Sequence, residues 1–529
     1  MDKKDTAMEA KKIKYPIGIQ TFDKIREGGY VYVDKTEMIY NLALNGGYCF
    51  LSRPRRFGKS LLVSTMEAYF KGQKGLFDGL AISELEKDWV EYPVLHFDFS
   101  GKDYLTSDAL SDALNVQLKR MEEDYGVEVI SDACDSRLKC IIDAAYRKTG
   151  RQVVILIDEY DKPIIDNLTR PELREPFRST LQGFYSVMKS KDAYIKFGFL
   201  TGVTKIGQMS VFSGLNNLND ISMDERYVSI CGITEAELNQ YFDESVEGLA
   251  QKNKLTKEEC YERLARMYDG YHFCEDSIGI YNPFSLLRTF DRQKFGKYWF
   301  ETGTPSFLVQ YLKAGNYNLD NISKNDIPVE VLSGTNYSDP KPITLMYQSG
   351  YLTIKDYDPE FQTYFLDYPN EEVESGFLNS LSQLYTPSLD EGEFSVARFV
   401  RALRNGETED FMTRFTAFLS DNSYQIQGDL ELYFQNTMSI MFKMMGLYVK
   451  TEYQTSNGRI DIVIDTANYV YIIELKRDQS PEIALKQIED KGYAKPFLAS
   501  GKTIVKLGID FSSSTRTVAS WQVAELTPN

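Results

Sequence analysis

The chain has 529 residues, a formal net charge of −17 and an apolar fraction of 43%. This length exceeds what one hydrophobic core supports, so roughly two to four domains are expected, and the apolar content excludes an extensively disordered protein. The charged N-terminus and short aliphatic runs exclude a secretion signal and a membrane span, which predicts a cytoplasmic protein without membrane contact.

Cysteine and histidine usage argues against a Cys/His metal centre. The six cysteines include no C-x-x-C pair, and the two histidines, His96 and His272, are far apart in the sequence. Zinc sites need such ligands at close spacing. Structural disulfides are equally unexpected in a large chain of a reducing compartment.

The negative charge is unevenly distributed. From Tyr424 onward, 11 Lys and Arg face 12 Asp and Glu, a net of about −1 that leaves about −16 on the preceding part. Phosphate contacts need local Lys and Arg. The nearly neutral C-terminal part repels the phosphates of a nucleic acid less than the preceding part does.

Strands and helices alternate in the first part of the chain. The predicted elements are a strand at 48–52, a helix after residue 60, a strand from Val94, helices at 106–125 and 136–148, a strand from Val153, a further helix and a strand from Ala193. Such alternation predicts an α/β fold with a parallel sheet covered on both faces. We assign residues 1–230 to this parallel-sheet domain.

A helical lobe is expected to follow at 231–300, with a winged-helix form as an alternative. Thr234 and Glu237 stand at capping-box spacing at the start of its first helix. Residues 301–395 have mixed periodicity and frequent turn residues, so we expect a connector there.

The C-terminal part, 396–529, is expected to form a second α/β domain in the order α-β-β-β-α-β. Its predicted elements are a helix at 430–445, strands at 447–453, 459–465 and 469–475, a helix at 481–497 and a strand at 503–512.

The sequence RPRRFGKS carries the end of a phosphate-binding loop. Gly58, Lys59 and Ser60 match G-K-[ST], in which backbone N–H groups cradle phosphates, the lysine reaches the β- and γ-phosphates and the hydroxyl holds Mg²⁺. The first glycine of the pattern is replaced by Arg53. A basic strand-to-helix turn that matches by chance is the alternative.

A second motif, about 100 residues downstream, favours the nucleotide interpretation. The aliphatic strand from Val153 ends in Asp158 and Glu159. In a P-loop ATPase, this aspartate orders Mg²⁺ through water and the glutamate polarises the attacking water. The two motifs occur in the right order and on the right elements, which predicts ATP and Mg²⁺ binding.

Several residues near these motifs keep alternative interpretations. Thr201 and Thr204 follow the next strand, where they serve either as sensors of the γ-phosphate or as ordinary turn residues. Arg53, Arg55 and Arg56 crowd the loop and could contact phosphate, DNA or only solvent.

A nuclease-like constellation lies near the C-terminus. Hydrolysis of a phosphodiester needs a cation, carboxylates that hold it and a group that orients water. Asp461 lies on one predicted strand, while Glu474 and Lys476 lie at i and i+2 on the next, so the latter two share a face. Glu431, on the preceding helix, offers a third carboxylate. The alternative is an exposed charged pair, but charges on such apolar strands are costly unless a metal or a partner compensates.

The helix after Lys476 carries two further polar residues. Gln487 could orient substrate or water. Tyr493 follows six residues later, about 240° around the helix, and is better explained as a packing residue.

The chain resembles a bacterial family of AAA-ATPase-like proteins fused to a C-terminal PD-(D/E)XK nuclease-superfamily domain. The matching segments are YPIGIQTFDKIREGGYVYVDKT, LSRPRRFGKSLL, VVILIDEYDKP, FLTGVTKI, YDGYHF, YNPFSLL, GRIDIVI and IIELK, and 300–395 matches least. By resemblance, Arg53 is the family's normal variation. The resemblance implies a P-loop NTPase sheet in residues 1–230 and a restriction-endonuclease-like α/β domain in residues 396–529. It also implies that Asp461, Glu474 and Lys476 form the nuclease core. Ile460 replaces the proline of the "PD" pair, but the aspartate is the residue that holds the metal.

The leading hypothesis is an ATP-regulated DNA endonuclease that uses Mg²⁺, with Mn²⁺ as an alternative metal, and that can form a homo-oligomer. Asp461 and Glu474, helped by Glu431, would hold the metal, and Lys476 would position water. Two other classes remain: a nucleotide-dependent switch with a catalytically silent C-terminal domain, and a DNA-binding scaffold whose ATPase drives assembly.

Overall fold

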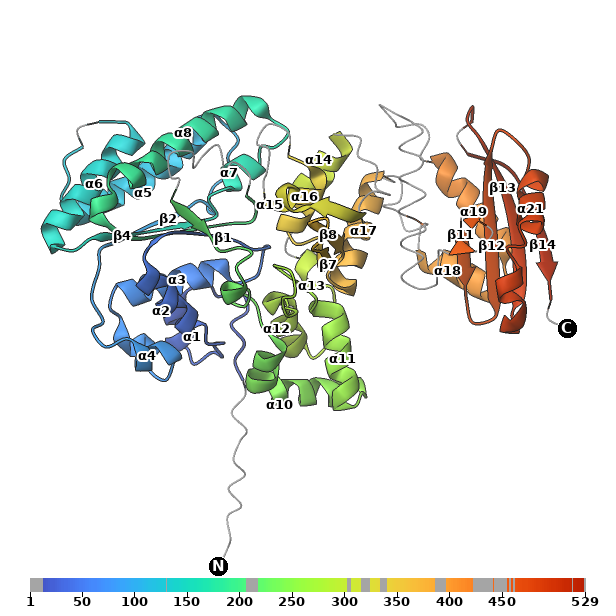
Figure 1. The fold of residues 1–529 in the computed structure, drawn as a ribbon, viewed down its shortest axis with the longest axis horizontal. Helices are drawn as coiled ribbons and strands as arrows, with labels where there is room; N and C mark the ends of the chain where they lie inside the picture. The colour runs from blue at the N-terminus through green and yellow to red at the C-terminus, as the bar shows by residue number, and fades with distance from the viewer. Residues whose placement is uncertain are drawn as a thin grey trace, which may run out of the picture. The chain divides into compact units, whose positions relative to one another are not determined.

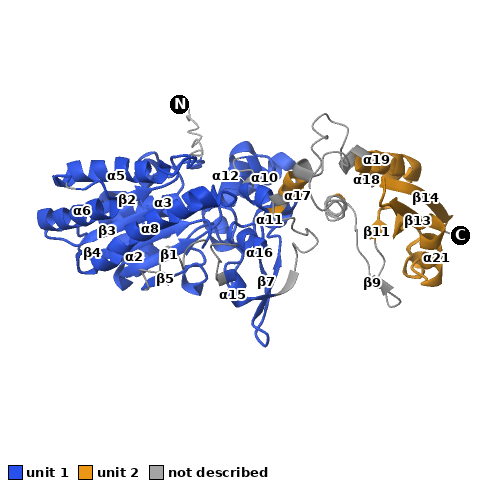
Figure 2. Cartoon of the chain, turned by 90° about the horizontal axis from the view of Figure 1, so that it is seen from above, with its two compact units in different colours: residues 1–311, 323–374 blue, residues 312–322, 375–529 orange. Residues whose placement is uncertain are grey.

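The computed structural model describes residues 13–129, 131–205, 217–301, 306–314, 324–333, 340–385, 396–421, 441, 454–455, 458–459, 462–515 and 517–527 (Figure 1). The chain forms two compact units, one of residues 1–311 and 323–374 and the other of residues 312–322 and 375–529 (Figure 2). No helix in the described part combines the length and apolar character that crossing a bilayer requires.

A five-stranded parallel sheet forms the core of the first unit. Its strands are β1 (Gly47–Ser52), β2 (Val94–Asp98), β3 (Val153–Asp158), β4 (Ile195–Gly202) and β5 (Leu218–Asp220), in the order β2-β3-β4-β1-β5. Every pairing is parallel. The strands' carboxyl ends therefore share one edge, where the residues that follow β1, β3 and β4 meet.

Helices cover both faces of this sheet, which confirms the α/β fold predicted from the sequence (Figure 1). One face carries α5 (Ala109–Tyr125), α6 (Cys134–Thr149) and α8 (Pro171–Ser190), and the other carries α2 (Thr36–Asn45) and α3 (Lys59–Phe70). All six residues of β3 are buried, as expected for a strand covered on both faces. Phe184 of α8 packs edge-on against Phe97 of β2, with ring centroids 5.0 Å apart.

Three helices, α10 (Glu235–Asn253), α11 (Lys257–Tyr268) and α12 (Pro283–Arg292), follow the sheet and share one apolar core. The predicted capping box is confirmed: the Glu237 N–H donates to the Thr234 hydroxyl, and the Thr234 N–H donates to the Glu237 carboxylate. Tyr15 packs against this core. The N-terminal segment after it therefore runs beside the helices.

Residues 324–367, whose sequence periodicity is mixed, contain a small antiparallel sheet. Its elements are β6 (Lys324–Pro328), α15 (Val329–Ser333), α16 (Pro342–Gln348), β7 (Thr353–Asp358) and β8 (Thr363–Asp367), with strand order β6-β8-β7. Register shifts in both pairings interrupt the two-residue alternation by which strands are predicted, which explains why the sequence pattern fails here.

The second unit contains a four-stranded sheet between helices. Its strands are β11 (Ile462–Asp465), β12 (Tyr469–Arg477), β13 (Thr503–Ser512) and β14 (Thr517–Leu526), in that order, and only the β12–β13 pairing among them is parallel. Apolar residues of α18 (Val396–Asn405) and α19 (Thr408–Asp421) pack on one face, and α21 (Pro481–Asp490) packs on the other. Tyr493 is buried in the α21 cluster, so it is a packing residue.

The prediction for this unit missed one strand, and two of its predicted elements lie outside the described residues. The sequence pattern missed β14, whose side chains are largely exposed along this edge strand. The helix predicted at 430–445, apart from Met441, and the strand at 447–453 lie outside the described residues.

Candidate functional site

The loop after β1 folds around the ammonium group of Lys59. Gly58, the N-cap residue of α3, has φ of 93°, a backbone conformation that L-residues rarely adopt. The Lys59 Nζ donates to the carbonyl oxygens of Arg53 and Pro54, at 3.0 and 3.1 Å. The first N–H groups of the 12-residue helix α3, which have no acceptor within the helix, lie at the end of this loop beside Ser60, where they can bind an anion.

Arg53, which replaces the first glycine of the motif, faces the protein interior. Its guanidinium donates to the carbonyl oxygens of Ser52, Ser222 and Tyr227, at 2.9, 2.7 and 3.1 Å, and lies over the Phe273 ring at 4.0 Å. The side chain is 1% exposed, and burial lowers its pKa. Our expectation that it contacts phosphate, DNA or solvent is therefore wrong, because backbone carbonyls hold it inside the fold.

Restoring the consensus glycine at this position should destabilise the protein. Arg53→Gly removes the donors of three carbonyl groups, so we expect the first unit to lose about 2–4 kcal/mol of unfolding free energy, without tighter nucleotide binding. Thermal unfolding measures the loss. Arg56→Gly is the control, because Arg56 is exposed with φ of 68° and tolerates glycine. An Arg53→Gly variant as stable as the wild type would contradict the structural role.

A hydrogen bond from β4 holds the carboxylate of Asp158 at the end of β3. Asp158 is buried, and its Oδ1 accepts hydrogen bonds from the Thr201 hydroxyl at 2.5 Å and from the Glu159 N–H at 3.0 Å. Glu159 has a left-handed φ of 52°, a strained conformation that often marks functional sites. Burial raises the pKa of Glu159, and the positive charge of Lys59 opposes this rise.

Asp161 is a buried carboxylate that the sequence analysis did not single out. It accepts hydrogen bonds from the N–H of Thr204 at 2.6 Å and from its hydroxyl at 2.9 Å. Burial raises its pKa, while these hydrogen bonds lower it. Both threonines considered as sensors thus donate to acidic side chains of the β3 end, Thr201 to Asp158 and Thr204 to Asp161. The signal available in sequence was the second aspartate of VVILIDEYDKP.

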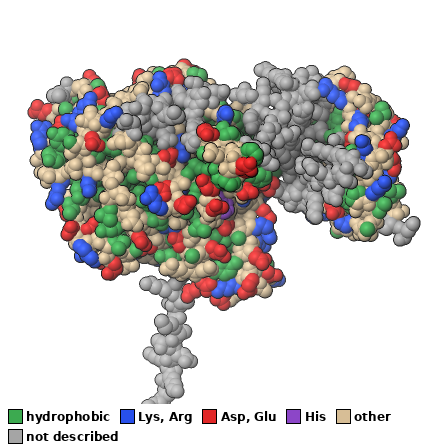
Figure 3. Space-filling view, viewed as in Figure 1, with side chains coloured by type: hydrophobic (Ala, Val, Ile, Leu, Met, Phe, Trp, Pro, Cys, Tyr) green, Lys and Arg blue, Asp and Glu red, His purple; other side chains and the backbone are tan. Residues whose placement is uncertain are grey.

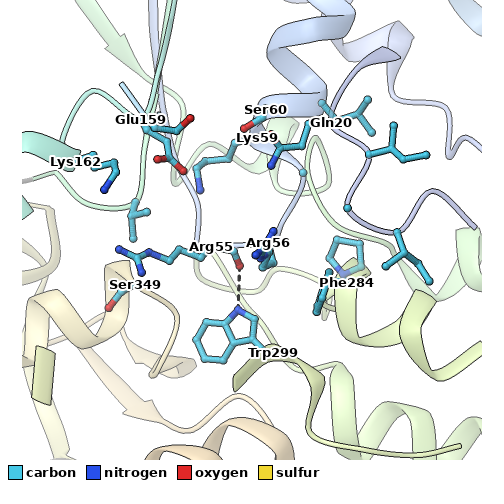
Figure 4. A pocket seen from close by; sticks show the side chains of 18 of the residues that line it. Gln20, Arg55, Arg56, Lys59, Ser60, Glu159, Lys162, Phe284, Trp299 and Ser349 are labelled. Carbon is cyan, nitrogen blue, oxygen red and sulfur yellow. Dashed lines mark hydrogen bonds between the residues drawn. The ribbon is translucent and has the colours of Figure 1, made fainter. Parts of the chain in front are cut away.

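A cavity of about 530 Å³ opens above these residues, a size within the usual range of small-molecule sites (Figure 4). Its polar side contains Gly58, Lys59, Ser60, Glu159 and Asp161, whereas Asp158 is not part of the lining. The remaining lining includes residues 16–20, Arg55, Arg56, Lys162, Pro283, Phe284, Leu287, Trp299, Phe307, Ser349 and Tyr351. The structure therefore brings the two predicted nucleotide motifs to one cavity.

Trp299 connects this cavity to a buried carboxylate. Its indole N–H donates to the backbone oxygen of Arg55 at 3.0 Å, and its backbone N–H donates to Glu372 at 2.9 Å. Burial raises the pKa of Glu372 to about 7. No sequence motif pointed to Trp299 or to Glu372, because their contacts join segments that are 244 and 73 residues apart in the sequence.

In the second unit, Glu474 and Lys476 lie on one face of β12, as their spacing predicts. The Lys476 Nζ is 2.9 Å from the Oε1 of Glu474, which is 2% exposed, and the Gln487 side-chain amide of α21 donates to the same oxygen. Asp461 and Glu431 lie outside the described residues. Among the residues that are described, no group of three or more His, Cys, Asp and Glu is placed to hold a metal ion.

Comparison with known proteins gives two family models and one full-length relative. The models, described as "Predicted AAA-ATPase" and "PD-(D/E)XK nuclease superfamily", match residues 16–212 and 429–521. An uncharacterized protein in the vnfD 5' region of Azotobacter chroococcum mcd 1 is 37% identical over 527 residues, which cover 97% of this chain and 99% of that protein.

Among solved structures, the ORC2 protein of Aeropyrum pernix, in its ADPNP–ADP complexes, is 12% identical. The match covers 69% of this chain and 98% of that chain with a TM-score of 0.28.

Proposed function

This chain belongs to a family of AAA-ATPase-like proteins with a C-terminal PD-(D/E)XK nuclease-superfamily domain, and from that premise we propose that it is an ATP-regulated, Mg²⁺-dependent DNA nuclease. The observation that carries the nucleotide half is the cavity that Lys59, Ser60 and Glu159 line together. For the nuclease half, the supporting observation is the buried Glu474 carboxylate paired with Lys476. We further propose that the protein is cytoplasmic and that its domain boundaries lie at residues 230, 300 and 395.

The cavity supports an assignment for each part of ATP. The triphosphate would lie against Gly58, Lys59 and the N-terminus of α3, where N–H groups and the ammonium compensate its charge. The base would lie toward residues 16–20 and the start of α12, where Phe284 offers an apolar surface. We assign Ser60 directly, and Asp158 through water, to the Mg²⁺ that neutralises the phosphates.

Hydrolysis at this site would use Glu159 as the base. It would accept a proton from the attacking water while the bond from that water's oxygen to the γ-phosphorus forms and the bond to the ADP oxygen breaks. The raised pKa of Glu159 favours this role, because a base titrating closer to neutral pH accepts a proton more readily.

In the second unit we assign metal binding to Glu474 and Asp461, with Glu431 as a third carboxylate. The metal, when bound, neutralises the scissile phosphate. Lys476 would position the water, and Gln487 would orient the Glu474 carboxylate through its amide. On the face shown in Figure 3, acidic and basic side chains of the described surface are interspersed, so DNA binding on this face would depend on local contacts rather than on a broad basic area.

A cleavage assay on the full chain tests the proposal. Wild-type protein should cut DNA with Mg²⁺ or Mn²⁺, at a rate that depends on ATP, and Lys59→Ala should remove the ATP dependence. If DNA stays uncut under every condition, the nuclease half is overturned. Two other outcomes identify the alternatives: tight ATP binding without turnover indicates a nucleotide-dependent switch, and DNA retention that survives Asp461→Ala without cleavage indicates a scaffold.

A further inference from the structure

The cavity of the first unit is lined by more cations than anions. Four basic residues, Arg55, Arg56, Lys59 and Lys162, face two acidic residues, Glu159 and Asp161. Two of the cations have partners within the protein: Lys59 donates to carbonyl oxygens of its own loop, and Lys162 pairs with Asp166 at 2.5 Å. The two arginines have no ion-pair partner within the described ranges of the chain, so their charge remains available to an anionic ligand.

The two arginines, although adjacent in sequence, point to different ends of the cavity. Figure 4 shows Arg55 extending toward Lys162 and Ser349, and Arg56 turned toward Phe284. The Arg56 guanidinium lies over the Phe284 ring, 5.2 Å from its centroid, at the apolar end. Arg55, in contrast, lies on the side of the cavity that carries Glu159 and Lys162, which line it together with Arg55 (Figure 4). Arg55 is therefore the arginine at the acidic end, where hydrolysis would occur.

Two contacts set the position of Arg55, one to its backbone and one to its side chain. The Trp299 indole N–H holds its backbone oxygen at 3.0 Å, and its guanidinium lies 5.6 Å from the centroid of the Phe307 ring. An aromatic ring steadies a guanidinium without neutralising it, because the attraction comes from the ring's quadrupole. These contacts restrict the side chain while leaving its N–H donors for a ligand.

We propose that Arg55 contacts the γ-phosphate of the nucleotide bound by its own chain, as an arginine supplied in cis to the hydrolytic transition state. This inference rests on the proposed ATP site. Arg55 makes and breaks no bond; its fork of N–H donors stabilises the charge on the γ-phosphate oxygens. Under this assignment Arg55 contacts the γ-phosphate, whereas Arg56 lies at the apolar end of the cavity beside Phe284.

Nucleotide binding tests the contact independently of turnover. In Arg55→Ala, the affinity for a non-hydrolysable ATP analogue should fall at least tenfold while that for ADP changes less than about twofold, because ADP lacks the γ-phosphate. Arg56→Ala is the matched control and should affect both nucleotides equally. Arg55→Lys should recover part of the affinity, since it keeps the charge but loses the fork. Calorimetric titration measures each constant, and thermal unfolding confirms that each variant is folded.

Mixing two inactive variants tests whether the arginine acts in its own chain. Arg55→Ala should reduce ATP turnover at least 100-fold, and Lys59→Ala should abolish it. An equimolar mixture should show only the sum of the two residual rates, because no chain holds both residues. Restored activity in the mixture would overturn the assignment in cis.

The binding outcomes separate this inference from the proposed function. A wild-type protein that binds neither nucleotide overturns the ATP site itself. A wild-type protein that binds both, together with an Arg55→Ala variant that weakens both equally or neither, overturns the Arg55 assignment and leaves the ATP site in place.

Discussion

Replacing Glu159 by glutamine should reduce steady-state ATP hydrolysis by at least 100-fold while leaving ATP affinity within about threefold of the wild type. The amide keeps the size of the side chain at the edge of the cavity but cannot accept the proton of the attacking water. Phosphate release measures turnover, and titration with a non-hydrolysable analogue measures affinity. Glu172→Gln, on the exposed first turn of α8, is the matched control and should behave as the wild type.

The same residue predicts the pH dependence of the wild-type rate. Only the deprotonated carboxylate can act as a base, and burial raises the pKa of Glu159 above that of an exposed glutamate. As pH falls, the rate should therefore decline at a higher pH than an ordinary glutamate would give. In Glu159→Gln the residual rate should lose this acidic limb. Unchanged turnover in Glu159→Gln would contradict the base assignment and favour the switch hypothesis.

The second large effect is expected on DNA cleavage. Lys476→Ala and Glu474→Gln should each reduce cleavage by at least 100-fold, because the first removes the group that would position water and the second removes a metal ligand. Lys486→Ala is the matched lysine control on α21, where the side chain is exposed. Gel assays on linear and supercoiled DNA, with Mg²⁺ or Mn²⁺, measure the rates.

Stability must be measured beside cleavage for these variants. Lys476 is the ion-pair partner of a carboxylate that is 2% exposed, so its removal is expected to lower the unfolding temperature as well as the cleavage rate. A folded Lys476→Ala variant that cuts DNA as fast as the wild type would contradict the proposed site. ATP hydrolysis should remain unchanged in it, because the lysine is not part of the nucleotide cavity.

Local patterns predicted the elements on which both candidate sites depend. The run ending at Ser52, the turn at Gly58 and the helix from Lys59 are each specified by neighbouring residues, as is the capping box at Thr234. The i, i+2 spacing of Glu474 and Lys476 placed them on one face because side chains of a strand alternate. In each case the determining interactions lie within a few residues.

The role of Arg53 could not be predicted in the same way. Its carbonyl partners include Ser222 and Tyr227, about 170 residues away, and the ring beneath its guanidinium belongs to Phe273. A pattern read from one loop contains no information about these partners. The small sheet at 324–367 was missed for a related reason, since bulges break the alternation that signals a strand.

The amino-acid sequence by itself determined the class of each unit, the phosphate-binding turn and the identity of the acidic residues, because short-range periodicity, glycine placement and strand alternation encode them. Only the tertiary structure decided that Arg55 and Arg56 line the ligand cavity while Arg53 is buried, which threonines donate to Asp158 and Asp161, and that Trp299 supports the loop. Those outcomes depend on parallel strand order and on side-chain contacts between distant segments, and such contacts exist only after the chain has packed.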